Sequence, residues 1–144
     1  MADGGDTPVT TPDSTAATPQ IDRLLRRARA RISRIDVHEA ARLLARGALV
    51  VDTRPVEQRR EHGAIPGSTA IERNVLEWRL DPTSPDRLPI VDEHDGSTVV
   101  YCQQGYSSSF AVASLVDLGL DDVHDLVGGF EAWAAAGLPV TAVH

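Results

Sequence analysis

The chain has a single cysteine among its 144 residues, which excludes both an internal disulfide and a Cys-x-x-Cys redox pair. It has no apolar run of the ~20 residues that a membrane-spanning helix needs. Its acidic, threonine-rich start also lacks the charged and apolar regions of a signal peptide. The net charge of −7 gives no basic excess, which argues against a nucleic-acid binder. We therefore expect a cytoplasmic protein without a membrane span, whose one thiol stays reduced and free to react.

The start of the chain differs in composition from the rest. Residues 1–20 are rich in Thr, Pro, Asp and Ala and cannot bury enough apolar surface to fold, which predicts a disordered tail. Apolar residues at helical spacing then predict a lead-in helix over residues 21–32. The arginine-rich stretch 23–34 could contact an acidic partner or an anionic membrane, but we favour a solvated helix face. Residues 33–144 suit one α/β domain.

Strand-like and helical patterns alternate from about residue 35 onward. Short apolar runs predict strands at 48–54, 69–72, 97–102 and 123–129. Helical patterns occur at 35–47, 55–63, 74–80, 108–119 and 130–137. This alternation predicts an α/β fold with a central parallel sheet covered by helices on both faces. Ligands bind such sheets at the C-terminal ends of the strands, where Asp52, Arg54 and Cys102 are expected.

The only cysteine, Cys102, ends a predicted strand, and a helix is predicted to begin near Ser107 or Ser108. The chain between them must curl tightly, which Gly105 permits because glycine adopts backbone angles closed to other residues. The amides of this curl and of the first helical turn would form an anion-binding nest around the sulfur. The nest and the positive helix end would lower the pKa of the thiol. A buried core cysteine is the alternative, and the loop context favours a nucleophile.

Three nucleophilic chemistries could use a cysteine in such a loop. A Cys-x5-Arg phosphatase needs a guanidinium six residues after the cysteine, where this chain has Ser108, and residues 102–109 contain no Lys or Arg. A Cys–His hydrolase needs a histidine base, and the five histidines lie in no such local signature. Sulfur transfer needs only a thiolate, whose persulfide the loop amides can hold. The residues therefore favour sulfur transfer.

Three motifs resemble the single-domain rhodanese family in order and spacing, over about residues 33–141. They are VVDTRPVEQRREHGAIPGS (50–68), VVYCQQGYSS (99–108) and VHDLVGGFEAWAAAGLPV (123–140). The resemblance implies that residues 33–144 form a rhodanese-like domain with a central parallel sheet. It also implies that Cys102 is the catalytic nucleophile and carries sulfur as a persulfide. The loop that binds substrate and persulfide would then consist of Gln103, Gln104, Gly105, Tyr106, Ser107 and Ser108.

The sequence departs from the family pattern at two places. Ala64 stands where the family usually has the histidine of its Gly-His-Ile-Pro-Gly motif, which we interpret as a packing change. The active loop is also uncharged, whereas rhodaneses that favour thiosulfate often carry a cation in or near it. Charge compensation is therefore expected from amides, hydroxyls or arginines elsewhere, such as Arg73 or Arg79.

Other polar and aromatic residues are candidates for the pocket or its support. Asp52 and Arg54 follow a strand, and we favour an internal ion-pair network over a direct role in the reaction. Glu57 or Glu61 is the expected partner of Arg54. Trp78 is expected to pack, with a place in the pocket wall as the alternative.

The sequence thus predicts a thiosulfate sulfurtransferase. It would move sulfane sulfur from thiosulfate or a persulfide donor to cyanide or a thiol acceptor through a Cys102 persulfide. Its partners would be a small-molecule sulfur donor and acceptor, with a protein thiol as another acceptor. No metal or cofactor is expected, because no cluster of residues has metal-ligand spacing. The alternative is a non-catalytic or partner-dependent sulfur-carrier or binding module, docked through the tail and residues 23–34.

Overall fold

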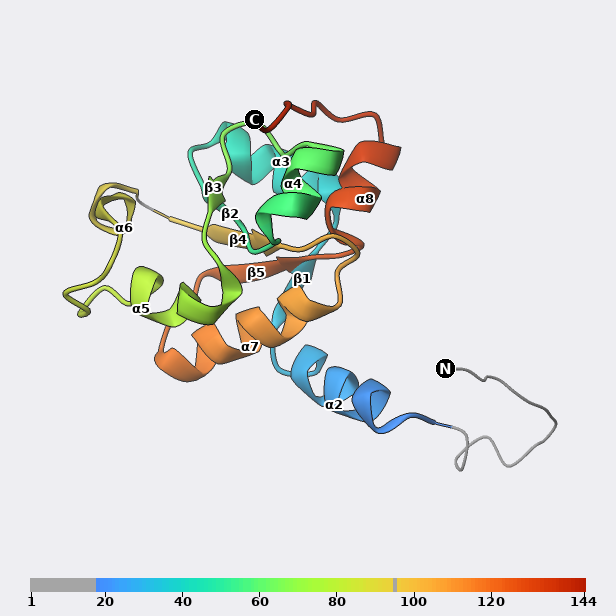
Figure 1. Cartoon of the computed structure of the whole chain (residues 1–144). Helices are drawn as coiled ribbons and strands as arrows, with labels where there is room; N and C mark the ends of the chain where they lie inside the picture. Colours follow the sequence, from blue (N-terminus) through green and yellow to red (C-terminus); the bar gives the residue numbers. More distant parts are fainter. Residues whose placement is uncertain (1–17, 95) are drawn as a thin grey trace, which may run out of the picture.

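A parallel β-sheet lies at the centre of the computed structural model, which describes residues 18–94 and 96–144 (Figure 1). The strands are β1 (Ser33–Ile35), β2 (Leu49–Asp52), β3 (Thr69–Ala70), β4 (Thr98–Tyr101) and β5 (Val123–Leu126). Within the described residues they form one sheet in the order β1-β5-β4-β2-β3, and all neighbours are parallel. None of the helices in these ranges combines the length and apolar composition that a bilayer crossing requires.

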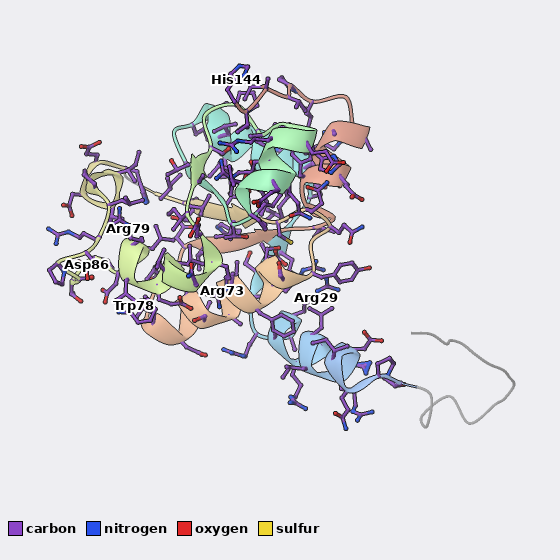
Figure 2. All side chains as sticks on the ribbon, viewed as in Figure 1. Arg29, Arg73, Trp78, Arg79, Asp86 and His144 are labelled. Atoms are coloured by element: carbon purple, nitrogen blue, oxygen red, sulfur yellow. The ribbon has the colours of Figure 1, made fainter. Side chains whose placement is uncertain are left out.

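Helices cover both faces of this sheet, as predicted. They are α2 (Gln20–Arg29), α3 (Val37–Ala45), α4 (Val56–His62), the 3-10 helix η1 (Arg73–Val75), α5 (Leu76–Leu80), α6 (Pro89–Glu93), α7 (Ser107–Leu118) and α8 (Gly129–Ala135). α5 and α7 lie on one side of the sheet, and α3, α4 and α8 lie on the other (Figure 1). α2 packs along α7. Arg29 of α2 lies near the N-terminal end of α7, and Arg79 of α5 lies toward the C-terminal end of α7 (Figure 2).

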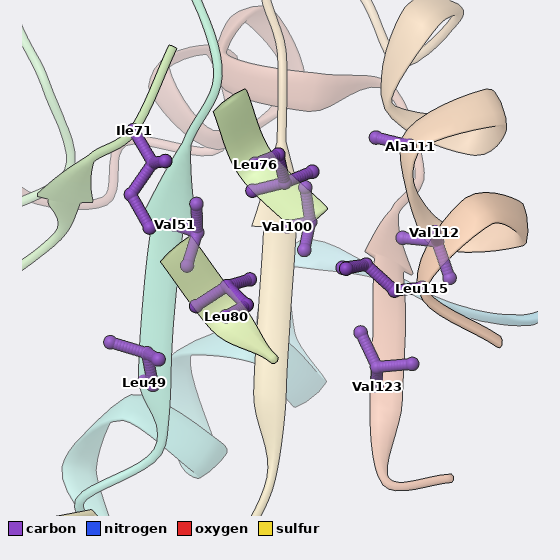
Figure 3. Packing of buried hydrophobic residues seen from close by; sticks show 10 residues of the cluster. All are labelled: Leu49, Val51, Ile71, Leu76, Leu80, Val100, Ala111, Val112, Leu115 and Val123. Atoms are coloured by element: carbon purple, nitrogen blue, oxygen red, sulfur yellow. The ribbon is translucent and has the colours of Figure 1, made fainter. Parts of the chain in front are cut away.

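Alternation along the central strands produces two apolar clusters. Successive strand residues point to opposite faces, so Val51 packs against α5 and α7 while Val50 packs against α3 and α8. Figure 3 shows the first cluster, in which Val51 and Val100 face Leu76 of α5 and Leu115 of α7. All four residues of β2 and of β4 are buried, which is the pattern of a parallel strand covered on both faces.

Three local expectations differ from the structure. The lead-in helix ends at Arg29 rather than at residue 32, and Ser33–Ile35 forms the edge strand β1 beside β5. Such a short strand has no periodicity to detect and needs its partner. No element was predicted between residues 80 and 97, but α6 forms there, with a proline in its first turn. Of the predicted disordered tail (1–20), residues 1–17 lie outside the described residues. Gln20 already belongs to α2.

The strand register brings the candidate polar residues to one edge of the sheet. Asp52 at the end of β2 is paired with Tyr101 at the end of β4. Asp125 of β5 is paired with Val100 on the other side of β4. Cys102 follows directly after β4, so it leaves the sheet between two carboxylates, at the edge where parallel sheets bind ligands.

Candidate active site

The loop from Cys102 to α7 curls around the cysteine sulfur. The backbone N–H groups of Gly105 and Ser108 donate hydrogen bonds to Cys102 Sγ, at 3.2 and 3.3 Å. Ser108 Oγ also lies 3.3 Å from the sulfur. Gly105 adopts φ of +87°, a backbone conformation that side chains with a Cβ rarely take. The curl therefore presents amide hydrogens to the position where negative charge would form on sulfur.

Two opposing influences act on the pKa of Cys102. Burial disfavours the charged thiolate and would raise the pKa. The contacts of the sulfur with the hydroxyls of Ser108 and Ser107, together with the hydrogen bonds from the amides of Ser108 and Gly105, outweigh burial, so the pKa of the thiol lies below its ordinary value. The thiolate, which is the nucleophilic form, is therefore more populated than in an ordinary cysteine.

A buried carboxylate fixes the first turn of α7 behind the cysteine. The hydroxyls of Ser108 and Ser109 donate to the two oxygens of Asp125, each at 2.6 Å. Arg34 of β1 donates from Nε to the same carboxylate at 2.9 Å and balances its charge. Sequence reasoning missed this network. Its one local signal was a carboxylate inside an apolar strand, since such residues are seldom buried unless they are paired.

The turn before α8 packs against the other side of the loop. The N–H groups of Phe130 and Glu131 donate to the carbonyls of Cys102 and Gln103, at 2.9 and 3.0 Å. A Cβ on Gly129 would lie 2.6 Å from the Cys102 carbonyl oxygen, closer than packed atoms allow. Position 129 therefore requires glycine, because only a residue without a Cβ lets this turn approach the loop so closely.

Asp52 and Arg54 form a buried ion pair beside the loop. Arg54 donates from Nε and Nη2 to the two oxygens of Asp52, at 3.0 and 2.8 Å, with both side chains almost fully excluded from solvent. The hydroxyl of Tyr101 donates to the same carboxylate at 2.9 Å. Arg54 also donates to the side-chain oxygen of Gln103 at 2.9 Å, which ties the pair to the loop. Asp52 is thus the partner of Arg54, and the expectation of Glu57 or Glu61 is wrong.

Two other candidates do not reach the loop. Arg73 donates to both carboxylate oxygens of Glu77, at 3.1 and 3.0 Å, and Arg79 donates to the backbone carbonyl of Asp86 at 2.6 Å. Figure 2 shows Arg79 and Asp86 at the end of the molecule away from Arg29. Neither arginine lines the pocket beside the cysteine, so the expectation that they support it is wrong.

The expectations for Trp78 and for the arginine-rich stretch 23–34 also differ from the structure. Trp78 is 57 % exposed and does not line the pocket beside the cysteine. Within the stretch 23–34, which was expected to be a solvated helix face, Arg29 is half-buried and contacts the loop. Arg29 donates from Nη2 to the Gly105 carbonyl at 2.8 Å and from Nε to Ser109 Oγ at 3.0 Å. No local signal distinguished it from the exposed arginines of the same helix.

A pocket of about 220 Å³ opens beside the sulfur. Its walls are Thr53, Arg54, Pro55, Gln58, Cys102, Gln103, Gln104, Tyr106 and Ser107. Gly105, Ser108 and Asp52 support these walls from behind. A larger hollow of about 550 Å³ lies at the N-terminal edge of the sheet, around Leu49 and Thr98. The smaller pocket is the candidate active site, because it holds the thiol and lies at the edge where parallel sheets bind ligands.

Comparison with known proteins identifies a family model and several relatives. The model of the family "Rhodanese-like domain" matches residues 36–136. Thiosulfate sulfurtransferase GlpE of Pseudomonas entomophila is 36 % identical over 100 residues, which cover 69 % of this chain and 83 % of that protein. Chloroplastic thiosulfate sulfurtransferase 16 of Arabidopsis thaliana is 42 % identical over 62 residues, 41 % of this chain. The chain thus spans only about half of that relative, 52 % of its length.

Two solved structures are similar over different extents. A protein of unknown function and possible tyrosine phosphatase from Rhodopseudomonas palustris has a TM-score of 0.76 and 34 % identity. This match covers 94 % of this chain and 99 % of that one. Thiosulfate sulfurtransferase from Pseudomonas aeruginosa has a TM-score of 0.62 and 29 % identity, over 78 % of this chain and 20 % of that one.

Proposed function

Because the chain belongs to the rhodanese-like family, we propose that it is a sulfurtransferase with Cys102 as its nucleophile. The observation that carries this proposal is the pair of backbone N–H groups on Cys102 Sγ, in a loop that opens onto a pocket. Such donors stabilise a sulfur anion without a general base. The lowered pKa of the thiol supports the same role. A free thiol persists in a reducing compartment, so we propose the cytoplasm as the site of the reaction.

The proposed reaction has two displacement steps. The Cys102 thiolate attacks the sulfane sulfur of thiosulfate or of a persulfide donor. A new sulfur–sulfur bond forms on Cys102, and the old one breaks, so that its electron pair leaves with sulfite or with the donor thiolate. The loop amides then hold the Cys102 persulfide anion. Cyanide, a small thiol or a protein thiol attacks the outer sulfur, and the electron pair of the broken bond returns to Cys102.

Phosphoryl transfer is disfavoured for this loop. The possible tyrosine phosphatase from R. palustris raises the question because its fold and sequence are similar. In this chain the position that needs the phosphate-clamping arginine holds Ser108, whose hydroxyl donates to Asp125. Failure to hydrolyse p-nitrophenyl phosphate is the expected outcome.

The second candidate function is a partner-dependent sulfur carrier or binding module. The observation that favours it is the absence of Lys and Arg from residues 102–109, which gives a small anionic donor no direct ion pair in the loop itself. A carrier would take sulfur from a protein donor and show no steady turnover with thiosulfate and cyanide.

Intact-mass measurement of the full chain tests both candidates. Incubation with thiosulfate should add ~32 Da, one sulfur atom, and cyanide should then remove it as thiocyanate. Cys102→Ser should gain no mass, whereas Arg46→Ala, at an exposed position outside the pocket, keeps the thiol and should still gain it. Steady turnover would favour the enzyme, and sulfur uptake that needs a protein donor would favour the carrier. No mass gain with thiosulfate or any persulfide donor would overturn the proposal.

A further inference from the structure

The uncharged loop must accommodate negative charge on sulfur in the thiolate and again in the persulfide. This chain has 14 basic residues, all of them arginines, and none lies within residues 102–109. In the described part of the chain, two arginines donate hydrogen bonds to this loop from elsewhere. Arg54 contacts Gln103, and Arg29 contacts Gly105 and Ser109. The two differ in what surrounds their charge.

Arg54 is already balanced. It donates to both oxygens of Asp52, and neither side chain is accessible to solvent beyond about a hundredth of its surface. The positive charge of Arg54 is therefore matched by the negative charge of its own carboxylate. This pair positions Gln103 but adds little net charge at the sulfur.

Arg29 has only neutral partners among the described residues. They are the Gly105 carbonyl at 2.8 Å, the Ser109 hydroxyl at 3.0 Å and the ring of Tyr106, whose centroid lies 5.5 Å from the guanidinium carbon. None of the ion pairs in the described ranges includes Arg29. The nearby carboxylate of Asp125, which shares Ser109 with Arg29, is already paired with Arg34.

Among the buried and half-buried groups around Cys102, the charges balance only when the cysteine is ionised. The carboxylate of Glu131 also accepts a hydrogen bond from Gln103 Nε2, at 3.3 Å, but it is exposed and keeps its hydration. Arg29 and Arg34 contribute two positive charges, and Asp125 contributes one negative charge. With the neutral thiol this group carries a net charge of +1, and with the thiolate or persulfide anion the sum is zero. A half-buried arrangement of this kind favours the anion, because Coulomb interactions are stronger there than in bulk water.

Arg29 also acts on the backbone that holds the sulfur. Its Nη2 binds the carbonyl of Gly105, whose own N–H donates to Cys102 Sγ. In a planar trans peptide the C=O and N–H point in opposite directions, so the Tyr106 N–H points away from Arg29. Arg29 thus holds Gly105, whose N–H contacts the sulfur, in place. It also polarises the peptide group between Gly105 and Tyr106.

We propose that Arg29 is a positioning residue that supplies, for the Cys102 anion, the positive charge the active loop itself lacks. This role rests on the proposed sulfur transfer for its purpose. It places a functional side chain in α2, before residue 36, where the match to the family model begins.

The pH profile of Cys102 alkylation tests this proposal. Since Cys102 is the only cysteine, reaction with iodoacetamide followed by intact-mass measurement reports its ionisation alone. Arg29→Ala should raise the midpoint of the profile by about half a pH unit. Arg29→Gln, which keeps an N–H donor without the charge, should raise it similarly. Arg29→Lys, which restores the charge, should recover part of the shift.

Two matched variants separate this role from general effects of charge or helix docking. Arg26→Ala removes one positive charge from an exposed position of the same helix. Arg31→Ala removes the 2.7 Å ion pair to Asp117 that joins the end of the α2 segment to α7. Both should leave the midpoint unchanged, with circular dichroism and thermal unfolding checking that every variant is folded.

The proposal fails if the Arg29→Ala and Arg29→Gln profiles overlay that of the parent chain. It also fails if Arg26→Ala shifts the midpoint as much, because net charge would then explain the effect, or if Arg31→Ala does, because helix docking would. These profiles need no sulfur donor. A shift in the Arg29 variants without sulfur uptake from thiosulfate or any persulfide donor would therefore overturn the proposed function and leave the role of Arg29 intact.

Discussion

Two arginine clusters contact the same loop in different electrostatic settings. In the closed cluster, Arg54 is fully buried and paired with Asp52 under the hydroxyl of Tyr101. In the open cluster, half-buried Arg29 contacts a carbonyl and a hydroxyl at the loop. A fully buried charge is costly unless a partner balances it, whereas a half-buried charge can keep part of its hydration. The closed cluster therefore fits a structural role, and the open cluster leaves a positive charge for a reacting anion.

Removing the buried cation should have the largest effect on stability. Arg54→Ala leaves the Asp52 carboxylate buried without its partner and should lower the free energy of unfolding by about 3–5 kcal/mol. Arg29→Ala, which orphans no charge, should lower it by roughly 1–2 kcal/mol. Urea unfolding measures both. Equal losses would erase the distinction between the clusters. Adding Asp52→Asn to Arg54→Ala should restore part of the loss, because the unpaired charge is gone.

The second-largest predicted effect is a loss of stability at alkaline pH, caused by ionisation of Tyr101 in the closed cluster. Burial, and then the negative charge of Asp52, raise the pKa of Tyr101 to about 12, from an ordinary value of 10.0. The native state then holds this proton more tightly than the unfolded chain. Its stabilisation is complete below pH 10 and is lost as pH rises from about 10 to about 12, by roughly 2–3 kcal/mol.

Urea unfolding over this alkaline range measures that loss in the parent chain and two variants. Tyr101→Phe should remove this part of the pH dependence, and Tyr106→Phe, at an exposed position of the loop, should retain it. If Tyr101→Phe loses stability with pH as steeply as the parent, the Asp52–Arg54–Tyr101 cluster is not closed to solvent.

The smallest predicted difference, between two glycine variants, concerns the turn behind the loop. Gly129 (φ +62°) and Gly137 (φ +76°) both have left-handed backbone, but an added Cβ meets the Cys102 carbonyl oxygen only at Gly129. Gly137→Ala should cost about 1–2 kcal/mol for backbone strain. Gly129→Ala should cost about 1–3 kcal/mol more, because the loop must move. Thermal unfolding and Cys102 alkylation report both effects, and identical losses would show that the loop does not need this close approach.

The main elements of the fold could be predicted from local pattern. The continuous apolar runs of β2 and β4 indicate strands buried on both faces, and the glycine after α7 marks its end. The edge strand β1 could not be found in this way. Its three residues pair with β5, which lies about ninety positions later in the chain, and only that pairing makes them a strand.

In the candidate site too, the local features could be predicted from the sequence and the long-range contacts could not. Cys102 and Gly105 lie close together in the sequence, and the strand before them and the helix after them indicated a curled loop. The side chains behind that loop come from distant segments, as the contact between Arg29 and Gly105 does, with a separation of 76 residues. The sequence suggested Arg73 or Arg79 as the cation near the loop. Glu77, four residues after Arg73, was a local signal of its actual partner, whereas nothing near Arg79 showed that the Asp86 carbonyl binds it.

The sequence alone therefore determined a parallel α/β fold, a lone cysteine after a central strand and a loop without charge. These features follow from short-range periodicity and turn-forming residues, which act within a few positions of one another. Only the tertiary structure decided which arginines face that loop and which of them a carboxylate already balances. That outcome depends on how α2, β1 and β5 pack around α7, and electrostatic interactions depend on distance in space rather than on separation along the chain.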